Sequence, residues 1–100
     1  MYKYASLSPA TAKGKKYKIL LYDKDKKKLK TIQFGASGYE DYTDHKNDER
    51  KERYLQRHRS SEDWNNPATP GAAARYVLWS AKSVSQGFQN YLNNFNLTKL

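Results

Sequence analysis

The sequence predicts an α+β fold, in which an N-terminal basic β-hairpin packs against about three helices in a single small domain. Three observations indicate this class. The chain has 100 residues, which is the length of one domain. Residues 15–34 hold two runs of β-branched and aromatic residues around a polar turn. Residues 84–95 carry apolar side chains at the spacing of one helix face.

The hairpin is the first regular element that the sequence predicts. Residues 1–14 are rich in Ser, Ala, Thr, Pro and Lys, so we expect an irregular arm before a single α+β domain over residues 15–100. The predicted strands cover residues 16–22 and 29–34, with a turn between them. Alternation places apolar side chains on both faces of the first strand, so each face could be covered.

Three helices are expected after the hairpin. Thr43 is a candidate N-cap for a charged helix that runs from Asp44 to about Arg59. Thr69 followed by Pro70 predicts the start of a short apolar helix over residues 72–79. A capping box of Ser83 and Gln86 predicts the start of an amphipathic helix over residues 84–94. The predicted core consists of Ile19, Leu21, Ile32, Phe34, Tyr54, Leu55, Trp64, Val77, Leu78, Trp79, Phe88, Leu92 and Phe95.

Positive charge is concentrated at the N-terminal end. Residues 1–34 carry ten lysines against Asp23 and Asp25, which gives +8 of the total of +9. A one-sided positive field attracts polyanions, meaning nucleic acid or an acidic protein surface. The residues predicted to bind such a surface are Lys13, Lys15, Lys16, Lys18, Lys24, Lys26, Lys27, Lys28 and Lys30. The alternative is that these lysines only protect a sheet edge from aggregation.

A second group of basic residues recurs along one side of the charged helix. Its members are Lys46, Arg50, Arg53 and Arg57. Acidic residues share this helix, and carboxylates would repel phosphate groups. We therefore interpret this group as a helix contact that suits a protein partner better than a nucleic-acid groove.

Reactive chemistry is not indicated. The chain has no Cys, which excludes disulfides and thiolate zinc sites. His45 and His58 are thirteen residues apart, about 20 Å along a helix, so they cannot share a metal ion. No nucleotide-binding or metalloprotease motif is present. We expect a protein that is not an enzyme, with no catalytic residue, metal or cofactor.

The chain also lacks the apolar run of a transmembrane helix or of a signal peptide, so we expect no membrane span and no secretion.

The middle of the chain resembles a family of small uncharacterised proteins encoded by large double-stranded DNA viruses, of the phycodnavirus and mimivirus kind. The resemblance covers about residues 16–80. Its most specific block consists of Phe34, Gly35, Gly38, Tyr39, Asp41, Tyr42, Thr43, His45 and Lys46, followed by Arg50, Tyr54, Leu55 and His58. The segment Pro70-Gly71-Ala72-Ala73-Ala74 departs from the family pattern and alters the start of the short helix, as expected of a divergent member.

The resemblance implies a virion component, such as a minor capsid protein, made in the cytoplasm or nucleus of an infected cell. Its partners would be acidic surfaces of other virion proteins, contacted through the lysine-rich hairpin. The alternative is a genome-associated protein that binds nucleic acid through the same lysines. Because lysines attract phosphate as point charges and read bases poorly, such binding would be independent of sequence.

Overall fold

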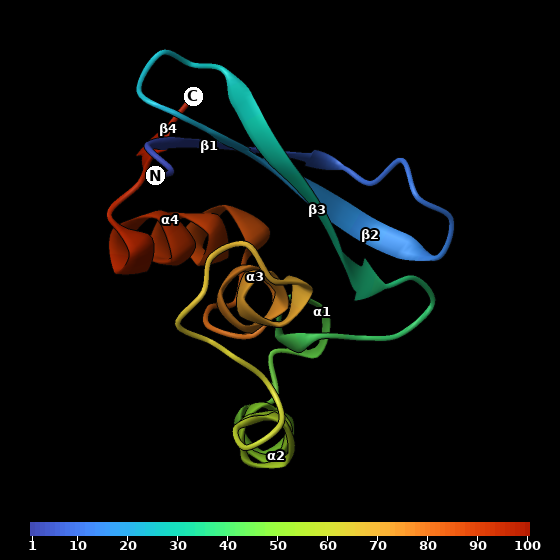
Figure 1. Ribbon diagram of the computed structural model, residues 1–100. Coiled ribbons are helices and arrows are strands. Elements are labelled where there is room, and N and C mark those ends of the chain that lie inside the picture. The colour runs from blue at the N-terminus through green and yellow to red at the C-terminus, as the bar shows by residue number, and fades with distance from the viewer.

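The computed structural model describes all 100 residues as three layers, and it confirms the predicted α+β class and single domain. A four-stranded sheet of order β3-β2-β1-β4 is covered on one face by α3 and α4, and α2 lies beyond them (Figure 1). The elements are β1 (Tyr4–Pro9), β2 (Lys15–Tyr22), β3 (Lys28–Ala36), α1 (Tyr42–His45), α2 (Asp48–His58), α3 (Pro70–Val77), α4 (Val84–Phe95) and β4 (Thr98–Lys99).

The predicted hairpin is confirmed as β2 and β3. The two strands are antiparallel, with Ile19 opposite Ile32, and a bulge interrupts the register beside the turn. At the turn, the Asp23 carboxylate accepts hydrogen bonds from the backbone N–H groups of Asp25 and Lys27, both at 2.9 Å. This Asx-type geometry fixes the tip of the hairpin locally, without help from the rest of the domain.

The prediction of an irregular arm over residues 1–14 is wrong for residues 4–9. Residues 4–9 form β1, which pairs antiparallel with β2 and places Ala5 opposite Leu21. Ala5 is fully buried, because the side chain packs under the helices on the inner face of the sheet. The short β4 was not predicted, and it pairs in parallel with β1.

The predicted charged helix is divided in two, and Thr43 is not its cap. Asp41 is the N-cap of the short α1, and Thr43 lies inside it. Lys46 then takes a left-handed conformation with φ of 55°, which ends α1. Asn47 caps α2 by accepting hydrogen bonds from two backbone N–H groups. Because Asn and Asp are the preferred N-caps, the Asp41 and Asn47 side chains explain both helix starts.

The two C-terminal helices begin where the sequence predicts. The Thr69 hydroxyl accepts from the Ala72 N–H at 3.1 Å, and the Ser83 hydroxyl accepts from the Gln86 N–H at the same distance. The Gln86 side chain donates to Asn90 instead of returning to the cap, so this capping box is only half formed. None of the helices has the length and apolar character needed to cross a bilayer.

The core lies between the inner face of the sheet and the helices α3 and α4. Ten of the predicted core residues are buried, whereas Trp64, Trp79 and Phe95 are only partly covered. Tyr91 was not included in the predicted core, yet it is fully buried. Its hydroxyl donates to the Pro67 carbonyl at 2.7 Å, which satisfies the polar end of the ring.

Candidate binding surfaces

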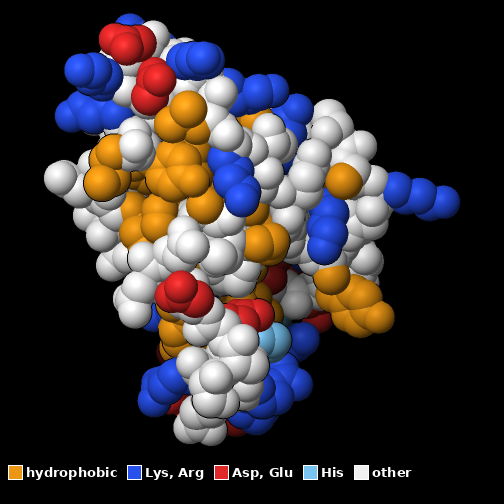
Figure 2. Space-filling view, in the orientation of Figure 1, with side chains coloured by type: hydrophobic (Ala, Val, Ile, Leu, Met, Phe, Trp, Pro, Cys, Tyr) orange, Lys and Arg blue, Asp and Glu red, His pale blue; other side chains and the backbone are white.

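The exposed lysines of the hairpin lie at its two ends, except for Lys30, which is exposed on β3. Lys24, Lys26, Lys27 and Lys28 surround the β2–β3 turn, and Lys13 and Lys15 lie at the other end of the hairpin. Figure 2 shows basic side chains gathered over the end of the molecule that holds this turn, and again over α2. We call Lys24, Lys26, Lys27 and Lys28 the lysine tip.

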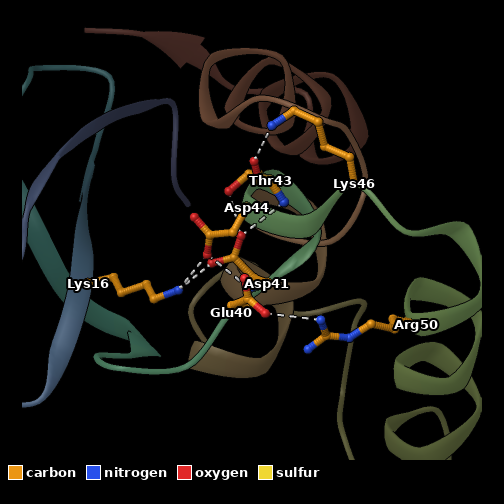
Figure 3. A network of polar contacts seen from close by, with 7 residues as sticks. All are labelled: Lys16, Glu40, Asp41, Thr43, Asp44, Lys46 and Arg50. Carbon is orange, nitrogen blue, oxygen red and sulfur yellow. Dashed lines mark hydrogen bonds and ion pairs between the residues drawn. The ribbon is translucent and has the colours of Figure 1, made fainter.

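Lys16 differs from the other predicted binding residues, because the structure uses its charge internally. The Lys16 ammonium donates to Asp41 at 2.6 Å and to Asp44 at 3.2 Å (Figure 3). Asp41 is only 4% exposed, and it also accepts a hydrogen bond from the Thr43 backbone N–H. No other lysine takes part in an ion pair.

We call Lys16, Asp41 and Asp44 the Lys16 network, and the contacts within it favour the charged forms of Lys16 and Asp44. Burial disfavours the charged ammonium of Lys16, but the hydrogen bonds and attraction of Asp41 and Asp44 outweigh burial and raise the pKa of Lys16 above 10.5. The hydrogen bond from the Asp41 backbone N–H lowers the pKa of Asp44 below 3.8, and Lys16 acts in the same direction. Lys16 and Asp44 are therefore both charged at neutral pH.

The same network fixes the hairpin to the start of α1. Gly35 has φ of 80°, and a Cβ atom at this position would lie 2.9 Å from Leu78 and 3.2 Å from Lys16. Glycine is thus required where β3 passes closely over these side chains. Gly35, Asp41 and Thr43 belong to the specific sequence block described above, and their contacts here are structural.

The outer face of the sheet has no helix over it (Figure 1). The register places Tyr4 opposite Tyr22 and Ser6 opposite Leu20 on this face. Lys18 lies next to them, opposite Gln33 of β3. The Lys26 ammonium lies 5.7 Å from the centre of the Tyr4 ring. This face therefore combines half-buried aromatic rings with lysines.

The basic residues predicted on the charged helix are separated by the structure. The Lys46 ammonium donates to the Thr43 carbonyl at 2.9 Å, at the C-terminal end of α1. Arg50, Arg53 and Arg57 instead line one surface cavity of about 450 Å³, beside Tyr39 and Trp79. We call this the arginine cavity. The spacing of the arginines was visible in the sequence, but the two aromatic residues come from distant segments.

The two histidines are far from forming a metal site. His45 Nδ1 accepts from the Asn47 backbone N–H at 2.9 Å, and His58 lies 3.2 Å from Glu62. No group of three His, Cys, Asp or Glu side chains is placed to hold a metal ion.

These features describe a small basic α+β protein with two cationic surfaces, one at the lysine tip and one at the arginine cavity. The sequence model of a family of unknown function (DUF5754) matches residues 5–58, so the chain belongs to this family. No curated protein and no solved structure matches the chain. The matched segment runs from β1 to the end of α2, and it includes the lysine tip, the Lys16 network and all three arginines of the cavity.

Proposed function

We propose that the protein is a non-enzymatic virion component, such as a minor capsid protein, that contacts acidic surfaces of other virion proteins through its lysine tip. The observation that carries this proposal is the state of the tip lysines, which are exposed and form no ion pair. The ammonium groups of the tip repel one another because they carry the same charge. Carboxylates of an acidic partner would neutralise them and remove that repulsion.

One further observation supports the non-enzymatic role, and another supports the assignment to a virion. Asp41, the one buried charged residue, contacts Lys16 and caps α1, so its carboxylate is occupied by structural contacts. This favours a structural role over acid–base chemistry. The assignment to a virion rests on the resemblance of the block from Phe34 to His58 to small proteins of large DNA viruses.

Sequence-independent binding of nucleic acid is the second candidate, and the outer face of the sheet favours it. Tyr4 and Tyr22 lie opposite each other on this face, which also carries Lys18, and the Lys26 ammonium lies 5.7 Å from the centre of the Tyr4 ring. Proteins that bind single strands combine stacking rings with lysines that follow the phosphates. The partners would be single-stranded segments of a genome.

A salt titration with matched variants distinguishes the two candidates. The test variant replaces Lys24, Lys27 and Lys28 by Gln, and the control variant replaces Lys46, Arg59 and Lys82 by Gln. Both remove three exposed positive charges, and only the first removes them from the tip. Binding to a polyglutamate peptide and to single- and double-stranded DNA of random sequence is measured by fluorescence anisotropy.

The virion proposal expects polyglutamate binding that the test variant loses and the control variant keeps. Steep salt dependence on DNA, with a log–log slope that falls by roughly three in the test variant, would favour the nucleic-acid candidate instead. Equal effects of the two variants on both ligands would contradict any special role of the lysine tip.

A further inference from the structure

The arginine cavity has the charge and size of a site for a small anion. Arg50, Arg53 and Arg57 follow one another at intervals of three and four residues, so they project from the same face of α2. They line the cavity together with one acidic residue, Glu40. The lining thus carries three positive charges against one negative charge. No acidic residue of α2 lines the cavity, so the repulsion of phosphate expected from the sequence of this helix is not built into the lining. Its volume of about 450 Å³ is within the usual range of ligand sites.

The three arginines are only weakly neutralised within the protein. Arg50 pairs at 3.1 Å with Glu40, which also lines the cavity (Figure 3 shows the pair). Arg53 reaches Glu49 only at 3.9 Å, and both of these side chains are more than half exposed. Arg57 makes no ion pair. The guanidinium groups of Arg53 and Arg57 are therefore available to an anion, and their planar forks match the oxygens of a phosphate group.

Two aromatic residues complete the cavity. Trp79 is stacked on Tyr54 with ring centres 4.1 Å apart and an angle of 1° between the planes, so its position is fixed. Tyr39 is 74% exposed, which is unusual for a large ring beside a cavity. Bases stack on exposed aromatic rings, and arginine also stacks on them. A ligand that carries both a phosphate and a flat ring would use every part of this lining.

We propose that the arginine cavity binds a nucleoside phosphate, with the phosphate on Arg53 and Arg57 and the base against Tyr39. The nucleoside phosphate is either a free mononucleotide or one unit of a single strand. The cavity lies on α2, at the opposite end of the molecule from the β2–β3 turn (Figures 1 and 2). The proposal therefore concerns a separate site and does not depend on the partner of the lysine tip.

Isothermal titration with AMP, inorganic phosphate and adenosine tests the combination of groups. We expect AMP to bind at least about tenfold more tightly than phosphate or adenosine alone, because only AMP contacts both the arginines and the ring. A short 5′-phosphorylated single strand distinguishes the two sources of the ligand. Tighter binding of the strand than of AMP would indicate a unit of a chain, and equal binding would indicate a free mononucleotide.

Variants of exposed residues keep the test independent of folding. The double variant Arg53→Gln/Arg57→Gln should weaken AMP binding about tenfold or more, whereas Arg59→Gln/Lys82→Gln, with the same loss of charge, should change it less than about twofold. Tyr39→Ala should weaken AMP binding and leave phosphate binding unchanged. Circular dichroism confirms that each variant is folded.

Two results would overturn the proposal. One is AMP binding no tighter than phosphate binding, which would reduce the cavity to a patch of nonspecific positive charge. The other is equal weakening by the cavity variant and by its charge-matched control. The variant of Lys24, Lys27 and Lys28 should bind AMP like the wild type, so failure of either proposal can be recognised separately.

Discussion

Replacing Lys16 by Met removes one ammonium group and keeps a side chain of nearly the same length. Asp41, at 4% exposure, would keep its bonds to Thr43 but lose its 2.6 Å contact with a cation. Removing one partner of a fully buried ion pair costs about 3–5 kcal/mol, and one hydrogen bond to a charged group contributes about 1.5–3 kcal/mol.

The Lys16 side chain is 19% exposed, so water partly screens the pair, and the lower part of this range applies. We expect Lys16→Met to reduce the free energy of unfolding by about 2–3 kcal/mol. Urea unfolding followed by tryptophan fluorescence and circular dichroism measures the change. The domain should remain folded, because typical domains are stable by about 5–15 kcal/mol.

Lys15→Met is the matched control, since Lys15 is the preceding residue of β2, is exposed and makes no ion pair. We expect its effect to stay within about 0.5 kcal/mol. A double-mutant cycle with Asp41→Asn should give a coupling energy of at least about 1 kcal/mol. Equal effects of Lys15→Met and Lys16→Met, or a coupling energy near zero, would refute the assignment of Lys16 to a stabilising network.

Three further predictions concern single positions. Gly87→Ala should destabilise the protein by about 1–3 kcal/mol in urea unfolding, because a Cβ atom would collide with the Val77 carbonyl of α3, and a neutral or stabilising effect would contradict this packing. Thr69→Ala should reduce the free energy of unfolding by about 1 kcal/mol through loss of the hydrogen bond to the Ala72 N–H, and no measurable loss would show that the cap is dispensable. Asp44 has a lowered pKa in the folded state, so its contribution is present above the ordinary value of 3.8 and is lost as the pH falls through the folded value. Thermal unfolding at a series of acidic pH values should therefore show a flatter dependence for Asp44→Asn than for the wild type, and identical slopes would argue against this role.

Local signals in the sequence were sufficient for much of the fold. The polar turn after Tyr22 predicted the hairpin, and Thr69 and Ser83 predicted the starts of α3 and α4. In contrast, β1 contains Ala5 and Ser6, which have little intrinsic preference for strands. Its conformation comes from pairing with β2, and such pairing is not visible in a local window of sequence.

The sequence predicted which residues of the two surfaces are basic, but it did not predict how they are arranged in space. The lysines of the hairpin could be named from the sequence, yet only the fold separates Lys16 from Lys15. The partner Asp41 lies 25 positions further along the chain. Likewise, the spacing of the arginines on α2 predicted a basic face. The cavity depends on Tyr39 and Trp79, which reach it from a loop and from the segment after α3.

The parallel pairing of β1 with β4 has a consequence for how the chain folds. Tyr4 pairs with Thr98, and the Thr98 N–H donates to the Lys3 carbonyl at 3.0 Å, so contacts join residues almost a full chain length apart. These contacts close a loop that includes nearly the whole chain. They are expected to form slowly, because closing a long loop costs conformational entropy before the contacts are gained. On a ribosome the sheet would stay incomplete until residue 99 had emerged. The same proximity would allow a short linker to join residue 100 to residue 1. A circular permutant with this linker and with new ends in the β2–β3 turn should form the β1–β4 pairing without waiting for that closure.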